Sequence, residues 1–279
     1  AYEALTQTPQ EHLEGVDHVV VAGSLDVIKE ILRLAMKYDF SIGIIPNRKQ
    51  KHLIKFYDLP KNPAAAAELA LRQDGQTIDL IVCNGEIMLF KAVMGRIPFL
   101  DTPARASWLQ VLLNALRKFV RFRLYAFKFG TAGKQEIDTA ASGCMILQHS
   151  RGSFGSRLIS HDHSFTDGMA SLVISAPISI MAYATLLRQA LKSSKKFKKL
   201  PSSIGYIKSP HIDIQPKTRL EVVIDDQQVT HTPLHCETIA KAVHINVGDR
   251  LREEAKDVTD AGERIDIENL PTEKELLKA

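Results

Sequence analysis

The chain has 279 residues, of which 45% are hydrophobic and 24% are charged, and its formal net charge is +4. This length and composition indicate a soluble globular protein with room for two domains. The longest apolar stretch, residues 172–187, is interrupted by Ser, Pro and Thr and is shorter than the roughly 20 residues that span a bilayer, so no transmembrane helix is expected. The small net charge gives no case for nucleic acid as a partner, and the polar N-terminus lacks the apolar core of a signal peptide. We therefore expect a cytoplasmic protein.

The first part of the chain alternates strand and helix signals. Residues 18–22 predict a buried strand, apolar residues recur at helical spacing between Val27 and Ala35, and residues 40–45 predict the next strand. Asn62 and Pro63 occupy the N-cap and first positions of a predicted helix over residues 64–72. This alternation favours a parallel sheet with crossover helices. We therefore assign residues 1–77 to an α/β domain of nucleotide-binding type.

From Ile78 onward the pattern is rich in β-structure. Strands are predicted over residues 78–83, 87–93, 120–129, 141–148 and 220–224, and helices over residues 103–118 and 177–192. We therefore expect an antiparallel β-sandwich over residues 78–248. The charged tail, residues 249–279, either packs back on the first domain or is partly disordered.

The chain has three cysteines, which are widely spaced. Cys83, Cys144 and Cys236 lie in apolar segments and form no Cys-x-x-Cys or Cys/His ligand pattern, so they are interpreted as reduced core residues. The sequence His161-Asp162-His163 places two possible metal ligands close together. Because no pattern of third and fourth ligands accompanies it, we predict no metal site. His211, His231, His235 and His244 are scattered and form no constellation in the sequence.

The order of the motifs resembles the lipid kinases of the bacterial diacylglycerol-kinase and sphingosine-kinase type. The segments that carry the resemblance are residues 19–23, 42–46, 78–81, 84–85, 165–168 and 223–226, and they cover most of residues 17–248. The resemblance implies an α/β domain followed by a β-sandwich, with ATP and Mg²⁺ as cofactors and a lipid hydroxyl as phosphoryl acceptor. The family's first strand, with its Asn-Pro and glycine turn, has no counterpart before His18. We therefore expect either that the chain is a fragment of something longer, with an N-terminally incomplete first domain, or that a dimer or a fusion partner covers the open sheet edge.

The first phosphate turn of the family departs from its pattern here. A phosphate turn uses glycines to bring backbone N–H groups close to the anion, and the following helix adds its positive end. The family has Gly-Gly-Asp-Gly-Thr, whereas this chain has Gly23-Ser24-Leu25-Asp26-Val27. The resemblance places a nucleotide site at Gly23, Ser24 and Asp26, although only one of three glycines is present.

The second phosphate turn has lost its glycines as well. The family's Pro-Leu-Gly-Thr-Gly-Asn-Asp corresponds to residues 46–52, Pro-Asn-Arg-Lys-Gln-Lys-His. Arg48, Lys49 and Lys51 either attract an anion by charge or form an ordinary solvated loop. These three residues complete the candidate nucleotide site.

The late hairpin supplies the candidate catalytic residue. The family's Asp-Gly-Glu, whose Asp is the general base toward the lipid hydroxyl, corresponds to Asp225-Asp226-Gln227. Asp225 is thus the candidate base, and a turn role for the same residue is equally compatible with the sequence. The lysines Lys195, Lys196, Lys198 and Lys199 either contact an anionic membrane surface, as a peripheral protein would, or form a solvated loop.

Two functions follow from these observations. The first is an ATP-dependent lipid kinase with Asp225 as base. The alternative is a catalytically inactive module of a larger protein, a pseudoenzyme that binds a lipid or a phosphorylated ligand, because the glycine loops are not retained.

Overall fold

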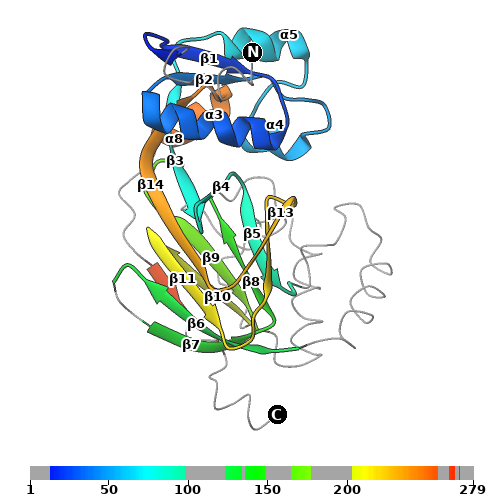
Figure 1. Cartoon of the computed structure of the whole chain (residues 1–279), viewed down its shortest axis with the longest axis vertical. Coiled ribbons are helices and arrows are strands. Elements are labelled where there is room, and N and C mark those ends of the chain that lie inside the picture. Colours follow the sequence, from blue (N-terminus) through cyan, green and yellow to red (C-terminus); the bar gives the residue numbers. More distant parts are fainter. Residues whose placement is uncertain are drawn as a thin grey trace. The chain divides into compact units, whose positions relative to one another are not determined.

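The computed structural model describes residues 13–97, 123–133, 136–148, 165–176, 203–256, 264–267 and 270. The chain divides into two compact units (Figure 1). The first unit comprises Ala1–Leu80, Ser164–Gly168 and Ile239–Asp260, and the second comprises Ile81–His163, Met169–Thr238 and Ala261–Ala279. Within the described ranges, no helix is long and apolar enough to cross a membrane.

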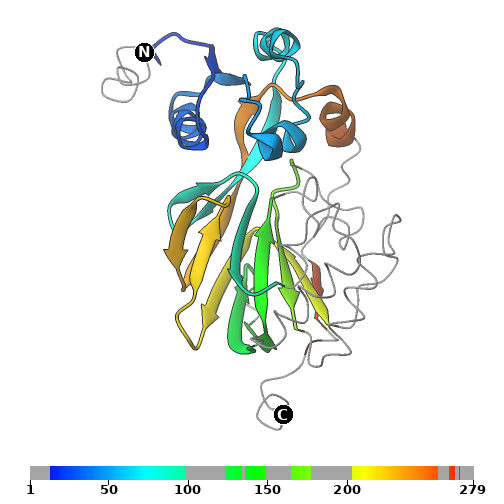
Figure 2. The ribbon, with the colours of Figure 1, turned by 90° about the vertical axis from the view of Figure 1, so that its right-hand side faces the viewer.

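The first unit is built on parallel pairing of the strands β1, β2 and β14. Its elements are β1 (His18–Val21), α3 (Leu25–Tyr38), β2 (Ser41–Ile44), α4 (Lys51–Phe56), α5 (Pro63–Ala70), the first part of β3 (Gln76–Cys83), the second part of β14 (Leu234–Ile245) and α8 (Asp249–Lys256). Strand β1 pairs in parallel with β2, and β2 pairs in parallel with β14. Helix α3 contacts both β1 and β2, and α5 packs on β2 (Figure 2). Parallel pairing and crossover helices therefore follow the predicted α/β pattern.

Local sequence explains where these helices begin. Ser24 caps α3 by accepting a hydrogen bond from the Val27 N–H, and Asn62 caps α5 by accepting one from the Ala64 N–H. Gly43 lets β2 approach α5, because a Cβ atom there would lie 1.9 Å from the carbonyl oxygen of Ala70. Pro63 fits the first position of α5, as predicted, because that position needs no N–H donor.

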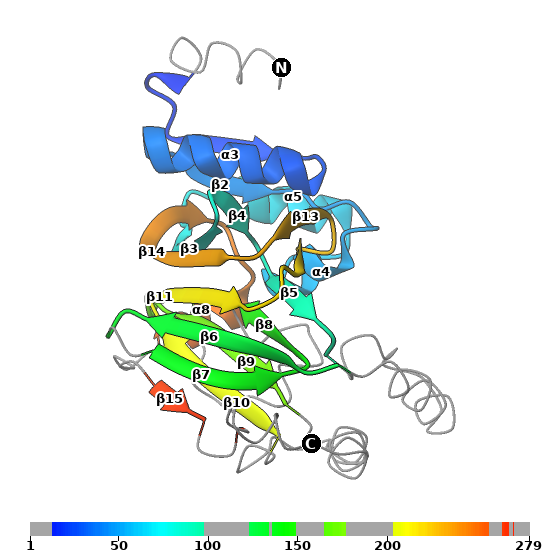
Figure 3. The same ribbon diagram turned by 60° about the horizontal axis from the view of Figure 1, so that its bottom comes forward.

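The second unit contains antiparallel strands in two layers around one core. Its strands are the end of β3, β4 (Glu86–Met88), β5 (Lys91–Gly95), β6 (Tyr125–Thr131), β7 (Glu136–Ala141), β8 (Gly143–Leu147), β9 (Ala170–Ser175), β10 (Ile204–Ser209), β11 (His211–Pro216), β12 (Glu221–Ile224), β13 (Gln228–His231), the start of β14 and β15 (Arg264–Asp266). One layer has the order β14-β11-β6-β7, and the other has the order β13-β12-β5-β8-β9-β10-β15. Figure 3 shows β6, β7 and β11 lying over β8, β9 and β10.

The core between the two layers draws on both of them. Phe127, Phe129 and Ile212 come from one layer, and Ile146 and Leu172 come from the other. All five side chains are almost fully buried. Apolar burial of this extent is the main source of stability for a sandwich.

The structure divides the chain differently from the predicted domains. The boundary after residue 77 moves to Leu80, and residues 239–248, which we placed in the sandwich, belong to the first unit. The physical reason is pairing: His244 and Ile245 of β14 lie opposite Ser41 and Ile42 of β2. In the tail, α8 packs within the first unit, where Arg252 bonds the carboxylate of Asp74.

Two predicted strands are each divided in the structure. The stretch 87–93 separates into β4 and β5, because the amides of Leu89 and Phe90 bond a side chain instead of a neighbouring strand. The stretch 141–148 begins in β7 and continues in β8, which lie in different layers. Most of residues 120–124, and the predicted helices 103–118 and 177–192, lie outside the described residues.

Candidate functional site

The two turns expected to hold phosphate lie at the same edge of the first unit's sheet. Strands β1 and β2 are parallel and in register, with Val21 opposite Ile44, so the turns that follow them begin side by side. The Gln50 side chain joins these turns, because its Nε2 donates to the carbonyl oxygen of Gly23 over 2.8 Å. The structure therefore brings the residue 23–27 turn and the residue 46–52 loop together.

Side chains of the loop itself occupy its backbone donors. The N–H of Asn47 donates to Gln50 Oε1 over 2.7 Å, and the N–H of Lys49 donates to Asn47 Oδ1 over 3.2 Å. A phosphate nest needs these N–H groups to point at the anion instead. In this loop, two carboxamide side chains therefore accept these N–H bonds.

In the first turn, backbone N–H groups are also occupied by bonds within the chain. Ser24 Oγ accepts from the N–H of Val27 over 3.4 Å, and the Ser24 carbonyl accepts from the N–H of Ile28. Asp26 is exposed in the first turn of α3, where a carboxylate offsets the positive end of the helix. This negative charge opposes binding of a second anion at the same place.

The basic side chains of the second loop are all at the surface. Arg48, Lys49 and Lys51 are exposed, and so are His52 and Lys55 of helix α4. Exposed cations attract anions at long range, although salt screens the interaction. The loop thus carries exposed positive charge, while side chains occupy the N–H groups of Asn47 and Lys49.

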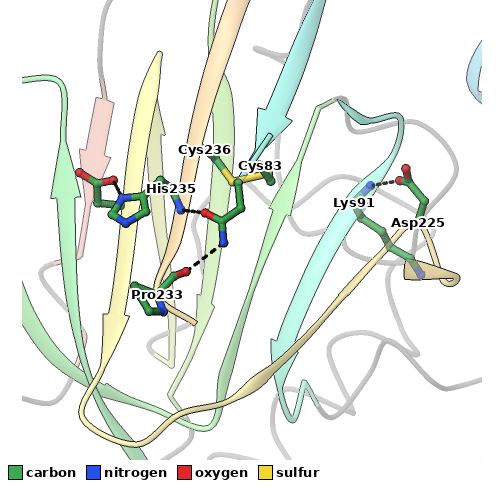
Figure 4. The surroundings of a disulfide bond; sticks show 8 residues. Cys83, Lys91, Asp225, Pro233, His235 and Cys236 are labelled. Carbon is green, nitrogen blue, oxygen red and sulfur yellow. Dashed lines mark hydrogen bonds and ion pairs between the residues drawn. A yellow bond between two sulfur atoms is a disulfide. The ribbon is translucent and has the colours of Figure 1, made fainter. Parts of the chain in front are cut away.

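The candidate base Asp225 lies in the second unit, in the tight turn between β12 and β13. Its carboxylate is almost fully buried, with 3% of the residue exposed. It accepts N–H bonds from Leu89 at 2.9 Å, Phe90 at 2.7 Å and Lys91 at 3.1 Å. Figure 4 shows Asp225 beside Lys91. In return, the N–H of Asp225 donates to the carbonyl of Lys91 over 2.8 Å. The carboxylate therefore fastens the β12–β13 hairpin to the segment between β4 and β5.

The turn has an unusual backbone conformation. Asp225 and Asp226 both have positive φ, at 53° and 62°. Asp226 stands where the family has glycine, which adopts such angles without strain. Its carboxylate forms an ion pair with Lys91 Nζ at 2.9 Å. The base role of Asp225 stays a prediction, and the contacts establish a structural role for the same carboxylate.

Comparison with known proteins gives a structural likeness without a sequence match. No family model matches the sequence, and no curated protein matches it. A protein provisionally named a diacylglycerol kinase from Bacillus anthracis strain Sterne is similar in structure, with a TM-score of 0.66 and 18% identity over 90% of this chain and 84% of that chain. A second structure from the same strain, named a diacylglycerol kinase, has a TM-score of 0.63 and 17% identity over 90% and 83% of the two chains. The chain has a diacylglycerol-kinase-like fold.

Within this diacylglycerol-kinase-like fold, a buried acid of the first unit organises a second turn. Asp79 of β3 accepts N–H bonds from Gly168 at 2.6 Å and from Lys241 at 2.7 Å. Burial raises the pKa of Asp79, because desolvation outweighs the effect of these two donors. Asp79 therefore holds the residue 165–168 turn against β14.

One group of polar residues on this fold was not predicted from the sequence. His211 and Asp213 point to the same side of β11, and Asp213 lies directly opposite His235 of β14. The Asp213 carboxylate contacts His235 Nδ1 at 2.6 Å and His211 Nε2 at 3.1 Å, so two of the scattered histidines do form a group. The alternation along β11 was the available signal. Among the described residues, however, no three His, Cys, Asp or Glu side chains are placed to hold a metal ion.

The cysteine prediction needs a correction for two of the three residues. Cys83 and Cys236 form a disulfide, while Cys144 is free and buried. The prediction failed because the two residues come from strands separated by 153 positions, and pairing of distant strands leaves no local signal. The candidate residues His161 and His163, and the lysines of residues 195–199, lie outside the described residues.

Proposed function

We propose that this chain is a non-catalytic member of the diacylglycerol-kinase-like fold that binds a lipid or a phosphorylated ligand. One observation carries the proposal: Asn47 and Gln50 bond the backbone N–H groups that a nucleotide phosphate would need. Gly23 is the one glycine that the first turn keeps, and its carbonyl is also engaged by Gln50. The residues present thus do not fit the triphosphate of ATP, and we derive no phosphoryl-transfer step from them.

The class of ligand is inferred from charge and from the neighbours' names. Arg48, Lys49 and Lys51 are exposed together, which suits an anionic group held by side chains. The similar structures are named for kinases of diacylglycerol, and this supports a lipid as the ligand. A peripheral membrane location and contact through Lys195, Lys196, Lys198 and Lys199 remain part of the proposal.

The sheet edge at β1 belongs to the same proposal. Among the described strands, β1 pairs with β2 alone, and Val20 on this strand is 38% exposed. An open parallel edge invites a further strand. A dimer or a fusion partner is our proposed cover for it.

The second candidate is an ATP-dependent lipid kinase. The shared fold and the position of Asp225 at the hairpin favour it. To act as a base, the carboxylate must reach a substrate hydroxyl, whereas Asp225 is buried and already accepts three N–H bonds. This burial makes the enzyme the second choice.

Nucleotide binding separates the two candidates. We expect millimolar ATP with Mg²⁺ to raise the unfolding temperature of the wild-type chain by less than about 1 °C, because few amides are available to the phosphates. The double variant Asn47→Gly and Gln50→Gly frees these amides and is expected to respond more strongly than wild type. Differential scanning fluorimetry measures both shifts.

The control is Lys49→Ala, which removes charge and keeps both carboxamides. A wild-type shift of several degrees that Lys49→Ala abolishes would overturn the non-catalytic proposal. So would transfer of labelled phosphate to diacylglycerol that Asp225→Asn abolishes while the variant stays folded.

A further inference from the structure

The disulfide Cys83–Cys236 joins the end of β3 to the start of β14 inside the second unit. Both cysteines are fully buried, and their Cα atoms are 4.2 Å apart. This distance is typical of directly opposed residues in a non-hydrogen-bonded antiparallel pair. Figure 4 shows the sulfur bridge between the two strands.

Asn84 extends the junction by one residue. Its N–H donates to the carbonyl of His235 over 2.9 Å, and its Oδ1 accepts from the N–H of His235 over 2.9 Å. Its Nδ2 donates to the carbonyl of Pro233 over 3.0 Å. The segment after Cys83 is therefore bonded to the segment before Cys236.

The same two segments meet again at Asp225. The segment that leaves Cys83 leads through β4 to Leu89, Phe90 and Lys91, and the segment that enters Cys236 begins at the Asp225 turn. The carboxylate of Asp225 bonds the three amides. The two segments thus form a closed ring, fastened by the disulfide at one end and by the Asp225 carboxylate at the other (Figure 4).

We propose that the Cys83–Cys236 disulfide is a redox-sensitive lock that holds the Asp225 turn against residues 89–91. This goes beyond the ligand-binding proposal, since it applies whether or not Asp225 ever accepts a substrate proton. Loss of the disulfide removes the covalent link at one end of the ring. The two segments are then held by the Asn84 bonds to Pro233 and His235, by the pairing of β5 with β12 and by the three amide bonds at Asp225. Such a local loss of order is distinct from unfolding of the sandwich.

The chemistry is ordinary thiol–disulfide exchange with a dithiol reductant. One thiolate of the reductant attacks a sulfur of the pair, the S–S bond breaks, and a mixed disulfide forms between protein and reductant. The second reductant thiol then attacks the reductant sulfur of that mixed disulfide and releases the remaining protein thiol. The two protein sulfurs gain two electrons and two protons, and the reductant becomes a disulfide. Because both sulfurs are buried, attack requires opening of the first residues of β14.

Cys144 does not compete for this exchange. Burial raises the pKa of its thiol, so it carries little of the reactive thiolate near neutral pH. It lies in the same core as the pair. The exchange at the lock therefore involves Cys83 and Cys236.

Hydrogen exchange read by mass spectrometry tests the lock on the full chain. Intact mass after alkylation first establishes whether the purified chain holds two protected cysteines. We expect the peptide over residues 84–95 to exchange about tenfold faster after reduction with a phosphine, while peptides from β8 and β9 are unchanged. The variant Cys83→Ser with Cys236→Ser is expected to reproduce the reduced pattern, and Cys144→Ser is the matched control that keeps the oxidised pattern.

Three results would overturn the proposal. The first is full alkylation of all three cysteines in the chain purified without reductant, which would mean that the pair does not form. The second is equal protection of residues 84–95 in the two redox states. The third is an equal loss of protection in β8 and β9, which would make the disulfide a global cross-link and not a lock on the Asp225 turn.

Discussion

At Asp225, three successive backbone amides converge on a single buried carboxylate. Asp225→Asn puts an NH₂ group where one of these amides needs an acceptor. We expect the variant to lower the free energy of unfolding by about 1–3 kcal/mol, since a buried donor loses its partner. Urea unfolding at pH 7, followed by circular dichroism, measures the change.

The neighbouring residue provides the control. Asp226 is exposed and has a φ of 62°, so Asp226→Gly relieves the backbone while it removes the ion pair with Lys91. These effects oppose each other and are expected to leave stability within about 0.5 kcal/mol of wild type. Should Asp225→Asn prove as stable as Asp226→Gly, the amide contacts would not matter for folding, and the base role would gain weight.

Single residues also show what the sequence was able to predict. Motif order was sufficient to single out Asp225, because the hairpin pattern is local. Its burial was not predictable, because the amides that bond it lie up to 136 positions away. For the same reason, separation along the chain, the sequence did not predict the disulfide between Cys83 and Cys236 or the contact between Asp213 and His235.

Among the elements, the loop between β2 and α4 has an arrangement of hydrogen bonds that its basic sequence did not predict. Its lysines and arginine drew attention, although two carboxamides organise it. One signal was present: an asparagine bonds backbone two residues onward in a common type of turn, as Asn47 does to Lys49. The contact of Gln50 with Gly23 depends on the parallel register of β1 and β2 and has no local signal.

Helix α8 is fastened to the first unit by an exposed ion pair whose strength depends on pH. Arg252 bonds both carboxylate oxygens of Asp74. This hydrogen bonding lowers the pKa of Asp74 from 3.8 to about 2. Since the folded pKa is depressed, the contribution of the pair is present above pH 3.8 and is lost as the pH falls toward 2. The effect is small because water screens the pair.

We therefore expect Arg252→Gln to lower the urea midpoint slightly at pH 5 and to lower it progressively less as the pH falls toward 2. Arg250→Gln removes the same charge from the same helix and serves as the control for net charge. Urea titrations of the three proteins at several pH values measure the difference. A deficit of Arg252→Gln that is as large at pH 2 as at pH 5 would show that the arginine acts through something other than Asp74, such as its bond to the Val247 carbonyl.

At the scale of the whole chain, neither unit is continuous in sequence. Strands β3 and β14 each contribute residues to both units, with divisions after Leu80 and after Thr238. Composition and strand signals predicted the succession of α/β and β-rich regions. They gave no sign that residues 239–248 return to the first unit, because that return depends on parallel pairing with β2.

Shared strands predict coupled unfolding, and Asn246 offers a way to test this. Asn246 is fully buried after β14, and its Nδ2 donates to the carbonyls of Ala70 at 3.0 Å and Arg72 at 2.6 Å. Asn246→Asp replaces the donor with an oxygen that faces two carbonyl oxygens, which we expect to cost about 2–4 kcal/mol. The perturbation lies entirely in the first unit.

If β3 and β14 make the two units one cooperative system, Asn246→Asp lowers the hydrogen-exchange protection of β9 in the second unit as much as that of β2 in the first. Measurement at increasing urea, below the unfolding midpoint, gives the opening free energy of each strand. The variant Asn246→Ala, which removes the donor without adding a repelling oxygen, is expected to show the same pattern at a smaller amplitude. Weaker protection of β2 alone would instead mean that each shared strand can open at its division and that the units unfold separately.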